Sequence, residues 1–96
     1  MAIQKLLAED QRLCLLRSLN DCGGTANESV VQDCLDAYGH AISRDAVRTH
    51  LAWLEEQGVL SLEDLAGCQI ATLTERGYDV VEGRCTVPGI KRSRRS

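Results

Sequence analysis

The sequence predicts one small α+β domain that is mostly helical, and three observations support this. The chain has 96 residues, 44% of them hydrophobic, which is enough for one core and too little for two. Apolar residues recur at helical spacing in segments that end at glycines. Two short apolar segments in the second half are separated by a loop that contains Gly67, a pattern typical of a β-hairpin.

The first predicted helix extends from about residue 3 to residue 19 and stops at the turn-forming residues 20–24. Its apolar residues cover far more than the ~100° stripe that one packing surface requires. We therefore expect either that this helix is central to the fold or that part of it awaits a partner subunit. The apolar residues are Ile3, Leu6, Leu7, Leu13, Cys14, Leu15, Leu16 and Leu19. Thr25-Ala26 then predicts a very short extended link.

Two shorter helices follow. Asn27 predicts the N-cap of the first, which stops at Gly39. The second, residues 43–57, begins with Ser43 as its N-cap and stops at Gly58. Its predicted buried side consists of Val47, Leu51 and Leu54. Two short helices joined by a Gly-containing turn predict a helix-turn-helix.

The remaining elements complete a recognisable order. Residues 59–62 and 68–73 predict two strands, joined by the loop 63–67. Thr74 caps a last short helix over residues 75–82. Helix, helix-turn-helix, hairpin and helix is the order of a winged helix-turn-helix domain, with a three-helix core, a two- to three-stranded wing hairpin and a C-terminal helix.

The charges are unevenly distributed. Residues 1–83 carry 14 acidic and six basic side chains, a net charge of −8, whereas residues 84–96 carry five basic side chains and no acid. We therefore predict a winged-helix domain over residues 1–83 and a flexible basic tail over residues 84–96. The tail either reaches for polyanions or only keeps the protein soluble.

Two phrases of the sequence resemble a known family. Residues 43–60, SRDAVRTHLAWLEEQGVL, resemble the recognition helix of small winged-helix transcriptional regulators of bacteria and phages, with the segment that leads into the wing. Residues 71–77, ATLTERG, are similar to the phrase with which many of these regulators leave the wing. The chain also resembles, over roughly residues 8–83, the short ArsR-type regulators of Mu-like prophages. This resemblance implies a DNA-binding transcriptional regulator with residues 43–57 in the major groove.

The predicted recognition helix carries four candidate DNA-binding residues, Arg44, Asp45, Arg48 and Thr49. Arg44 and Arg48 are one turn apart, and an arginine can clamp O6 and N7 of guanine. Thr49 can bond a base or a phosphate, and Asp45 can accept from cytosine or orient an arginine. This hypothesis requires that the two guanidinium groups face solvent, free of internal ion pairs. In the predicted wing, Glu63 and Asp64 would repel the DNA backbone.

The expected partner is double-stranded DNA. Four tail residues would add phosphate or minor-groove contacts: Lys91, Arg92, Arg94 and Arg95. Specific DNA binding usually needs two half-sites, so we also expect a homodimer, with the first helix as its interface. The alternative is a winged-helix adaptor for protein partners without sequence-specific DNA binding, favoured by the acidic body and wing.

The sequence also predicts that several kinds of site are absent. Five cysteines without a CxxC spacing argue against a disulfide framework or a metal site. Cys14, Cys34 and Cys68 are expected to pack, which leaves Cys22 and Cys85 as candidates for a thiol sensor. Catalytic motifs and cofactor-binding loops are lacking, so no enzyme and no cofactor are predicted. Without a bilayer-spanning run or a secretory signal, the expected compartment is the cytoplasm.

Overall fold

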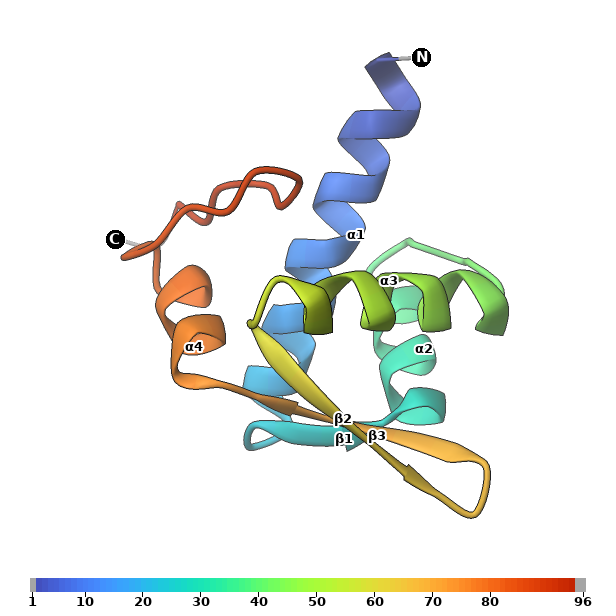
Figure 1. Cartoon of the computed structure of the whole chain (residues 1–96). Helices are drawn as coiled ribbons and strands as arrows, with labels where there is room; N and C mark the ends of the chain where they lie inside the picture. Colours follow the sequence, from blue (N-terminus) through green and yellow to red (C-terminus); the bar gives the residue numbers. More distant parts are fainter. Residues whose placement is uncertain (1, 95–96) are drawn as a thin grey trace.

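The computed structural model describes residues 2–94 and confirms the predicted α+β class. The elements are α1 (Ala2–Asp21), β1 (Thr25–Asn27), α2 (Glu28–Ala37), α3 (Arg44–Glu56), β2 (Leu60–Leu65), β3 (Cys68–Leu73) and α4 (Glu75–Val81). Figure 1 shows the helices standing on one side of a small sheet. Within residues 2–94 no helix is both long enough and apolar enough to cross a membrane.

Local capping signals fix where three of the helices begin. The side-chain oxygens of Asn27, Ser43 and Thr74 each accept a hydrogen bond from the backbone amide three residues later, at 2.9, 3.1 and 3.2 Å. These bonds satisfy amides that lack a partner within the first turn of a helix. The three predicted N-caps are therefore confirmed. Gly58, just after the C-cap of α3, has a φ of 75°, a conformation that glycine adopts readily.

The sheet has three antiparallel strands in the order β1-β3-β2. Ala71 of β3 is fully buried and lies opposite Ala26 on one side and Leu62 on the other. The link predicted at Thr25-Ala26 is therefore a true edge strand. This strand has three residues and makes a short connection from α1 to α2.

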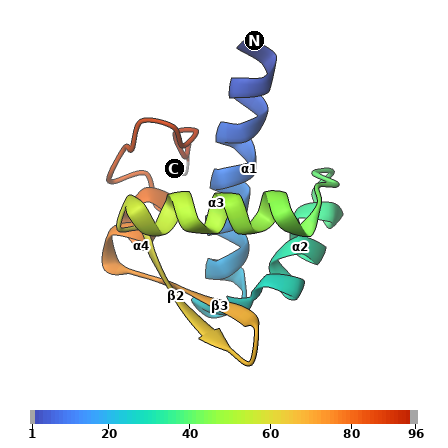
Figure 2. The same ribbon diagram turned by 45° about the vertical axis from the view of Figure 1, so that its right-hand side comes forward.

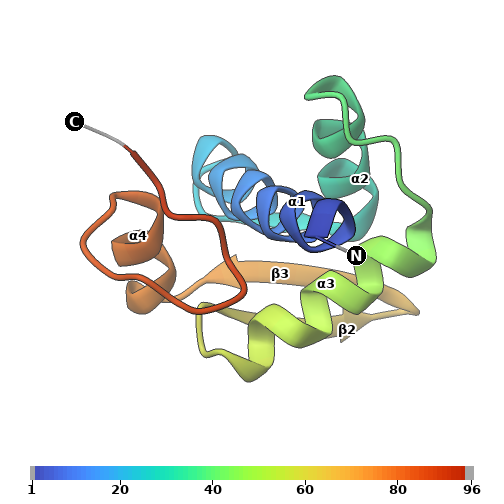
Figure 3. The ribbon, with the colours of Figure 1, turned by 90° about the horizontal axis from the view of Figure 1, so that it is seen from above.

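The C-terminal half of α1 is the centre of the core. Leu13, Leu15, Leu16 and Leu19 are each at most 1% exposed, and α2, α3 and α4 surround this half of the helix (Figure 3). The N-terminal half projects beyond the body (Figure 1), and three of its apolar side chains are exposed: Ile3, Leu6 and Leu7. The helix is thus central to the fold through its C-terminal half, and a partner subunit for the exposed N-terminal half stays a prediction.

The hairpin is longer than predicted. The loop expected over residues 63–67 is reduced to Ala66 and Gly67, because β2 continues through Glu63, Asp64 and Leu65. Acidic residues are uncommon in strands, but here both carboxylates lie on an exposed edge strand and can be hydrated. The prediction that Glu63 and Asp64 lie in the loop is therefore wrong, since both lie in the edge strand β2.

Residues 84–94 do not form the flexible tail that their charge suggested. Val87, Ile90 and Ser93 are at most 5% exposed, and the backbone amide of Lys91 donates to the carbonyl of Glu9 in α1. Figure 3 shows this segment between α4 and α1. The apolar residues between the basic ones anchor the segment, which a count of charges does not reveal. Arg95 lies outside the described residues.

Arg12 of α1 is the main polar anchor of this C-terminal segment. Its guanidinium lies 4.1 Å from the centroid of the Trp53 ring, and its Nη1 donates to the carbonyl of Gly89 at 2.8 Å. Gly89 has a φ of 96°, and a Cβ there would come within 2.6 Å of the Trp53 ring. The Arg12 Nε donates to Nδ1 of His50, which is 8% exposed. Through these contacts His50 and Trp53 pack within the fold.

The hairpin turn offers a test of backbone strain. Ala66 has a φ of 53°, a left-handed conformation that is costly for a residue with a Cβ but well tolerated by asparagine followed by glycine. We expect Ala66→Asn to raise the free energy of unfolding by about 0.5 to 1 kcal/mol in urea denaturation. Gly67→Ala, at a φ of 83° with open space around it, should lower it. Equal stability of both variants would contradict this account of the turn.

Candidate nucleic-acid interface

The N-terminal half of α3 exposes all four residues predicted to contact DNA. Figure 2 shows α3 crossing in front of α1, with the hairpin directly below it. The inner side of the helix is fully buried through Val47, Leu51 and Leu54. The outer side presents the four predicted residues, Arg44, Asp45, Arg48 and Thr49, all of which are exposed. The helical spacing of the apolar residues therefore determines which side chains can reach a ligand.

Arg48 is held by a carboxylate that the sequence reasoning did not pair with it. Its Nε donates to Oε1 of Glu28 at 2.7 Å, and its Nη2 donates to Oε2 at 3.1 Å, a two-point ion pair. The same Nη2 donates to the carbonyl oxygen of Gly67 in the hairpin turn at 3.1 Å. Arg48 thus connects α3 both to the start of α2 and to the hairpin.

Arg44 shares the same acceptor. Its Nε donates to Oε1 of Gln32 at 2.7 Å, and its Nη1 lies 3.5 Å from Oε1 of Glu28. The expectation that the two guanidinium groups are free of internal ion pairs is therefore wrong. The side chains of Arg44 and Arg48 nevertheless remain 45% and 46% exposed, so both still line the outer surface.

Glu28 is the first residue of α2 and is only 1% exposed. Besides the two arginines, the backbone amide of Gln69 in β3 donates to its Oε2 at 2.6 Å. The hydrogen bonds from Arg48 and from this amide lower the pKa of Glu28 to about 2, against its burial. From its position in the sequence alone, Glu28 is a carboxylate in the favourable first turn of a helix. Its partners lie 16 to 41 residues away, so no local pattern could have identified them.

Asp45 and Thr49 complete the exposed half of α3. The Thr49 hydroxyl donates to the backbone carbonyl of Asp45 at 2.9 Å, which leaves its oxygen able to accept. The Asp45 carboxylate helps to keep Arg48 charged, as does Asp64 of the hairpin, and both add to the Glu28 effect that raises the pKa of Arg48. The surface around the two arginines therefore contains both signs of charge.

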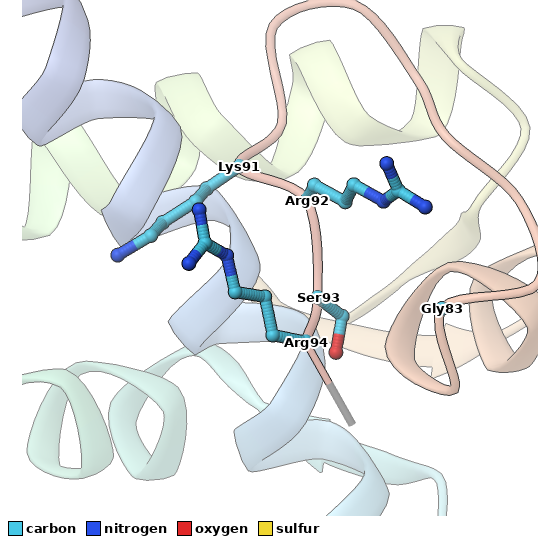
Figure 4. Close-up of a pocket in the computed structure, with 5 residues that line it drawn as sticks. All are labelled: Gly83, Lys91, Arg92, Ser93 and Arg94. Atoms are coloured by element: carbon cyan, nitrogen blue, oxygen red, sulfur yellow. The ribbon is translucent and has the colours of Figure 1, made fainter. Parts of the chain in front are cut away.

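The basic residues of the C-terminal segment form a second, separate group. Lys91, Arg92 and Arg94 line a pocket of about 540 Å³ together with Gly83 and Ser93. In Figure 4 the side chains of Lys91 and Arg94 point to one side of the segment and that of Arg92 to the other. Figures 1 and 3 place the segment beside α4, away from the N-terminal half of α3. The structure does not bring the two predicted groups together.

The cysteines do not create a further site in the described part of the chain. All five are free thiols, with Cys22 exposed and Cys85 partly buried against the core. Burial raises the pKa of Cys14 and of Cys34, which makes these thiols less reactive. Within residues 2–94, no three His, Cys, Asp or Glu side chains are grouped so that they could hold a metal ion.

Two relatives show the family of this chain. It is 56% identical over 92 residues to the uncharacterized protein gp26 of Escherichia phage Mu, and the match covers 96% of both chains. The chain belongs to the gp26 family. An uncharacterized protein of Haemophilus influenzae is 54% identical over 77 residues, which are 79% of this chain and 76% of that protein. No protein-family model matches the chain.

A solved structure shares the fold. The Bordetella bronchiseptica protein BpsR, whose DNA binding is regulated by 6-hydroxynicotinic acid, matches with a TM-score of 0.62 and 24% sequence identity. The match covers 75% of this chain and 49% of BpsR, so the chain spans about half the length of that regulator. The four helices and three-stranded antiparallel sheet are thus similar to a fold found in a DNA-binding regulator.

The buried Glu28 predicts how stability depends on pH. An unfolded glutamate titrates near 4.5, whereas the folded Glu28 titrates near 2, so its stabilising effect is complete above pH 4.5 and is lost as the pH falls toward 2. We expect Glu28→Gln to be less stable than the wild type at pH 7. We also expect this variant to lose less stability than the wild type as the pH falls from 4.5 to 2. Glu56→Gln, at an exposed site on α3, should follow the wild type in urea denaturation at each pH. The same pH profile for Glu28→Gln as for the wild type would contradict the assignment.

Proposed function

We propose that this protein is a winged-helix transcriptional regulator that binds double-stranded DNA, with residues 43–57 in the major groove. The observation that carries this proposal is the exposed N-terminal half of α3, which lies beside the β2–β3 hairpin in a fold shared with a DNA-binding regulator. A helix exposed in this way is what a major-groove reader requires. The relation to phage Mu gp26 favours a phage regulator, and the ArsR-type label is part of the same proposal.

Each group of predicted residues has a place in this proposal. Asp45 and Thr49 have side chains that can accept from or donate to base edges, and they point away from the core. Because Arg44 and Arg48 are both paired with Glu28, they do not meet the condition stated for guanine readers, and base reading is assigned to Asp45 and Thr49 alone. The C-terminal segment, which lies away from the N-terminal half of α3, supplies contacts to the DNA phosphates. The residues assigned to these contacts are Lys91, Arg92, Arg94 and, outside the described residues, Arg95.

The hairpin has a different role from that of a basic wing. Glu63 and Asp64 are exposed on its edge, and carboxylates there are repelled by phosphates. Arg48 reaches back from α3 to the turn and donates to the carbonyl oxygen of Gly67. We therefore assign DNA contact to α3 and the C-terminal segment, and we assign the hairpin the role of supporting Arg48.

A protein-interaction adaptor is the second candidate function. The observation that favours it is the number of exposed carboxylates on the C-terminal half of α3 and on the hairpin: Glu55, Glu56, Glu63 and Asp64. Such a surface repels DNA and suits a basic protein partner. DNA binding without sequence preference that disappears in Lys91→Ala/Arg92→Ala/Arg94→Ala, which removes exposed basic side chains and keeps the buried anchors of the segment, would favour this candidate.

The N-terminal half of α1 supports the homodimer in this proposal. Ile3, Leu6 and Leu7 lie on one side of a helix that projects beyond the body, and their side chains are 64%, 63% and 48% exposed. Apolar residues at this spacing form a stripe that a second copy of the helix can cover. A dimer would present two α3 helices to two half-sites.

Selection of DNA sites tests the proposed function. We expect the wild type to select a shared motif from random duplexes at fixed salt concentration, and Asp45→Ala/Thr49→Ala to lose or change that motif because it removes the side chains assigned to base edges. Asp36→Ala, on the exposed surface of α2, should select the wild-type motif. Equal binding of the wild type to all sequences would reject sequence-specific regulation and favour the adaptor.

Sedimentation tests the dimer. We expect Leu6→Ala/Leu7→Ala to sediment as a monomer under conditions in which the wild type is a dimer, because the variant retains helix propensity but loses most of the apolar stripe. Leu65→Ala, which removes an equally exposed leucine from the hairpin, should leave the mass unchanged. A wild-type mass for the α1 variant would exclude this interface.

A further inference from the structure

We propose that Glu28, Arg44 and Arg48 together form a preorganised binding site for one phosphate group of the DNA backbone. This inference rests on the proposed function and specifies what its two arginines recognise. It changes their role from reading guanine to fixing the position of the protein on the duplex. The evidence is the set of atoms that the internal hydrogen bonds use and the set that they leave free.

The inner side of each guanidinium group is already occupied. Arg48 uses Nε and Nη2 for Glu28, and Nη2 also donates to the carbonyl oxygen of Gly67. Arg44 uses Nε for Gln32 and Nη1 for Glu28. Among the described residues this leaves Nη1 of Arg48 and Nη2 of Arg44 without an acceptor. Each arginine can therefore offer one outer nitrogen while its ion pair stays intact.

This pattern fits a phosphate better than a guanine. To clamp guanine, one arginine must direct two N–H groups at O6 and N7 together. Both N–H groups of the Arg48 Nη2 are engaged, by Glu28 and by Gly67, so that arginine cannot do this without breaking its ion pair. The oxygens of a phosphate can instead accept one N–H from each of two neighbouring arginines.

The charge of the cluster also matches a phosphodiester. Two guanidinium groups around one carboxylate have a net charge of +1, which complements the single negative charge of a backbone phosphate. The carboxylates of Asp45 and Asp64 also act electrostatically on Arg48, so the positive potential does not extend along the duplex. The site should therefore take one phosphate and not a run of them.

Glu28 has the role of a positioning residue. Because it is 1% exposed and also accepts the Gln69 amide at 2.6 Å, it is fixed before any ligand arrives. It holds the two guanidinium groups in place, so less side-chain entropy is lost when they bind a phosphate. A surface arginine without such a partner would have to be ordered by the DNA itself.

A pair of matched double variants tests this site. Glu28→Gln/Arg48→Ala removes one acid and one base, so it keeps the net charge of the protein and leaves no buried carboxylate without a partner. Glu75→Gln/Arg76→Ala does the same at two exposed residues of α4, to which no DNA contact is assigned. Binding of the full chain to a short duplex of random sequence is measured by fluorescence anisotropy between about 50 and about 200 mM salt.

We expect the Glu28→Gln/Arg48→Ala variant to bind random DNA about tenfold more weakly, with the slope of log affinity against log salt smaller by about one. The Glu75→Gln/Arg76→Ala control should bind as the wild type does. Arg44→Ala, which keeps the two-point Glu28–Arg48 pair, should show the same kind of loss and guards against a folding defect in the double variant. Thermal melting checks that each variant is folded.

Three results would overturn the inference in distinguishable ways. Wild-type affinity in both the Arg44 and Arg48 variants would reject the phosphate site and leave the proposed function standing. A loss confined to one base pair of a selected motif would show that these arginines read a base. Failure of the wild type to bind any duplex would reject the proposed function, and the phosphate site with it.

Discussion

The arrangement of α2, α3 and the hairpin depends on the buried carboxylate of Glu28. A buried carboxylate is strongly destabilising unless charged or polar partners compensate for the lost water. Here the partners come from α3, through Arg44 and Arg48, and from β3, through the amide of Gln69. The compensation is complete only when all three elements are in place, so their positions are coupled. The apolar core contributes more to stability, but burial of leucine is non-directional. Val47, Leu51 and Leu54 determine which side of α3 faces inward, and the ion pair determines where along its length the helix sits.

The sequence predicted the features that are encoded locally. Ser43 caps α3 because its partner amide is three residues away, and the inner face of that helix follows from apolar spacing alone. The Glu28 cluster could not be found in the same way, since its donors are distant in the sequence and come together only in the folded chain. The prediction of a flexible C-terminal tail was wrong for a different reason. That prediction was based on the charge of the segment. Burial of two apolar residues, Val87 and Ile90, decides instead where the segment lies.

The electrostatics of the chain restrict how it can bind DNA. Residues 1–83 have a net charge of −8, so their overall field repels a polyanion. Attraction must come from two local groups, the guanidinium pair on α3 and the basic residues of the C-terminal segment. These groups lie apart on the domain, one at the N-terminal half of α3 and the other beside α4. Binding through two points of this kind fixes orientation more than it adds affinity.

This restriction connects the proposed DNA contact to the proposed dimer. One copy with two local cationic groups makes few phosphate contacts, and affinity for DNA rises steeply with their number. A second copy joined through the projecting half of α1 doubles the contacts without changing the charge of either surface, and linked sites bind as a unit. The exposed stripe of Ile3, Leu6 and Leu7 and the sparse cations of α3 are then parts of one arrangement. An acidic domain can bind DNA selectively in this way. The contacts of one copy are weak at any position on the duplex, so binding is strong only where both copies contact the DNA.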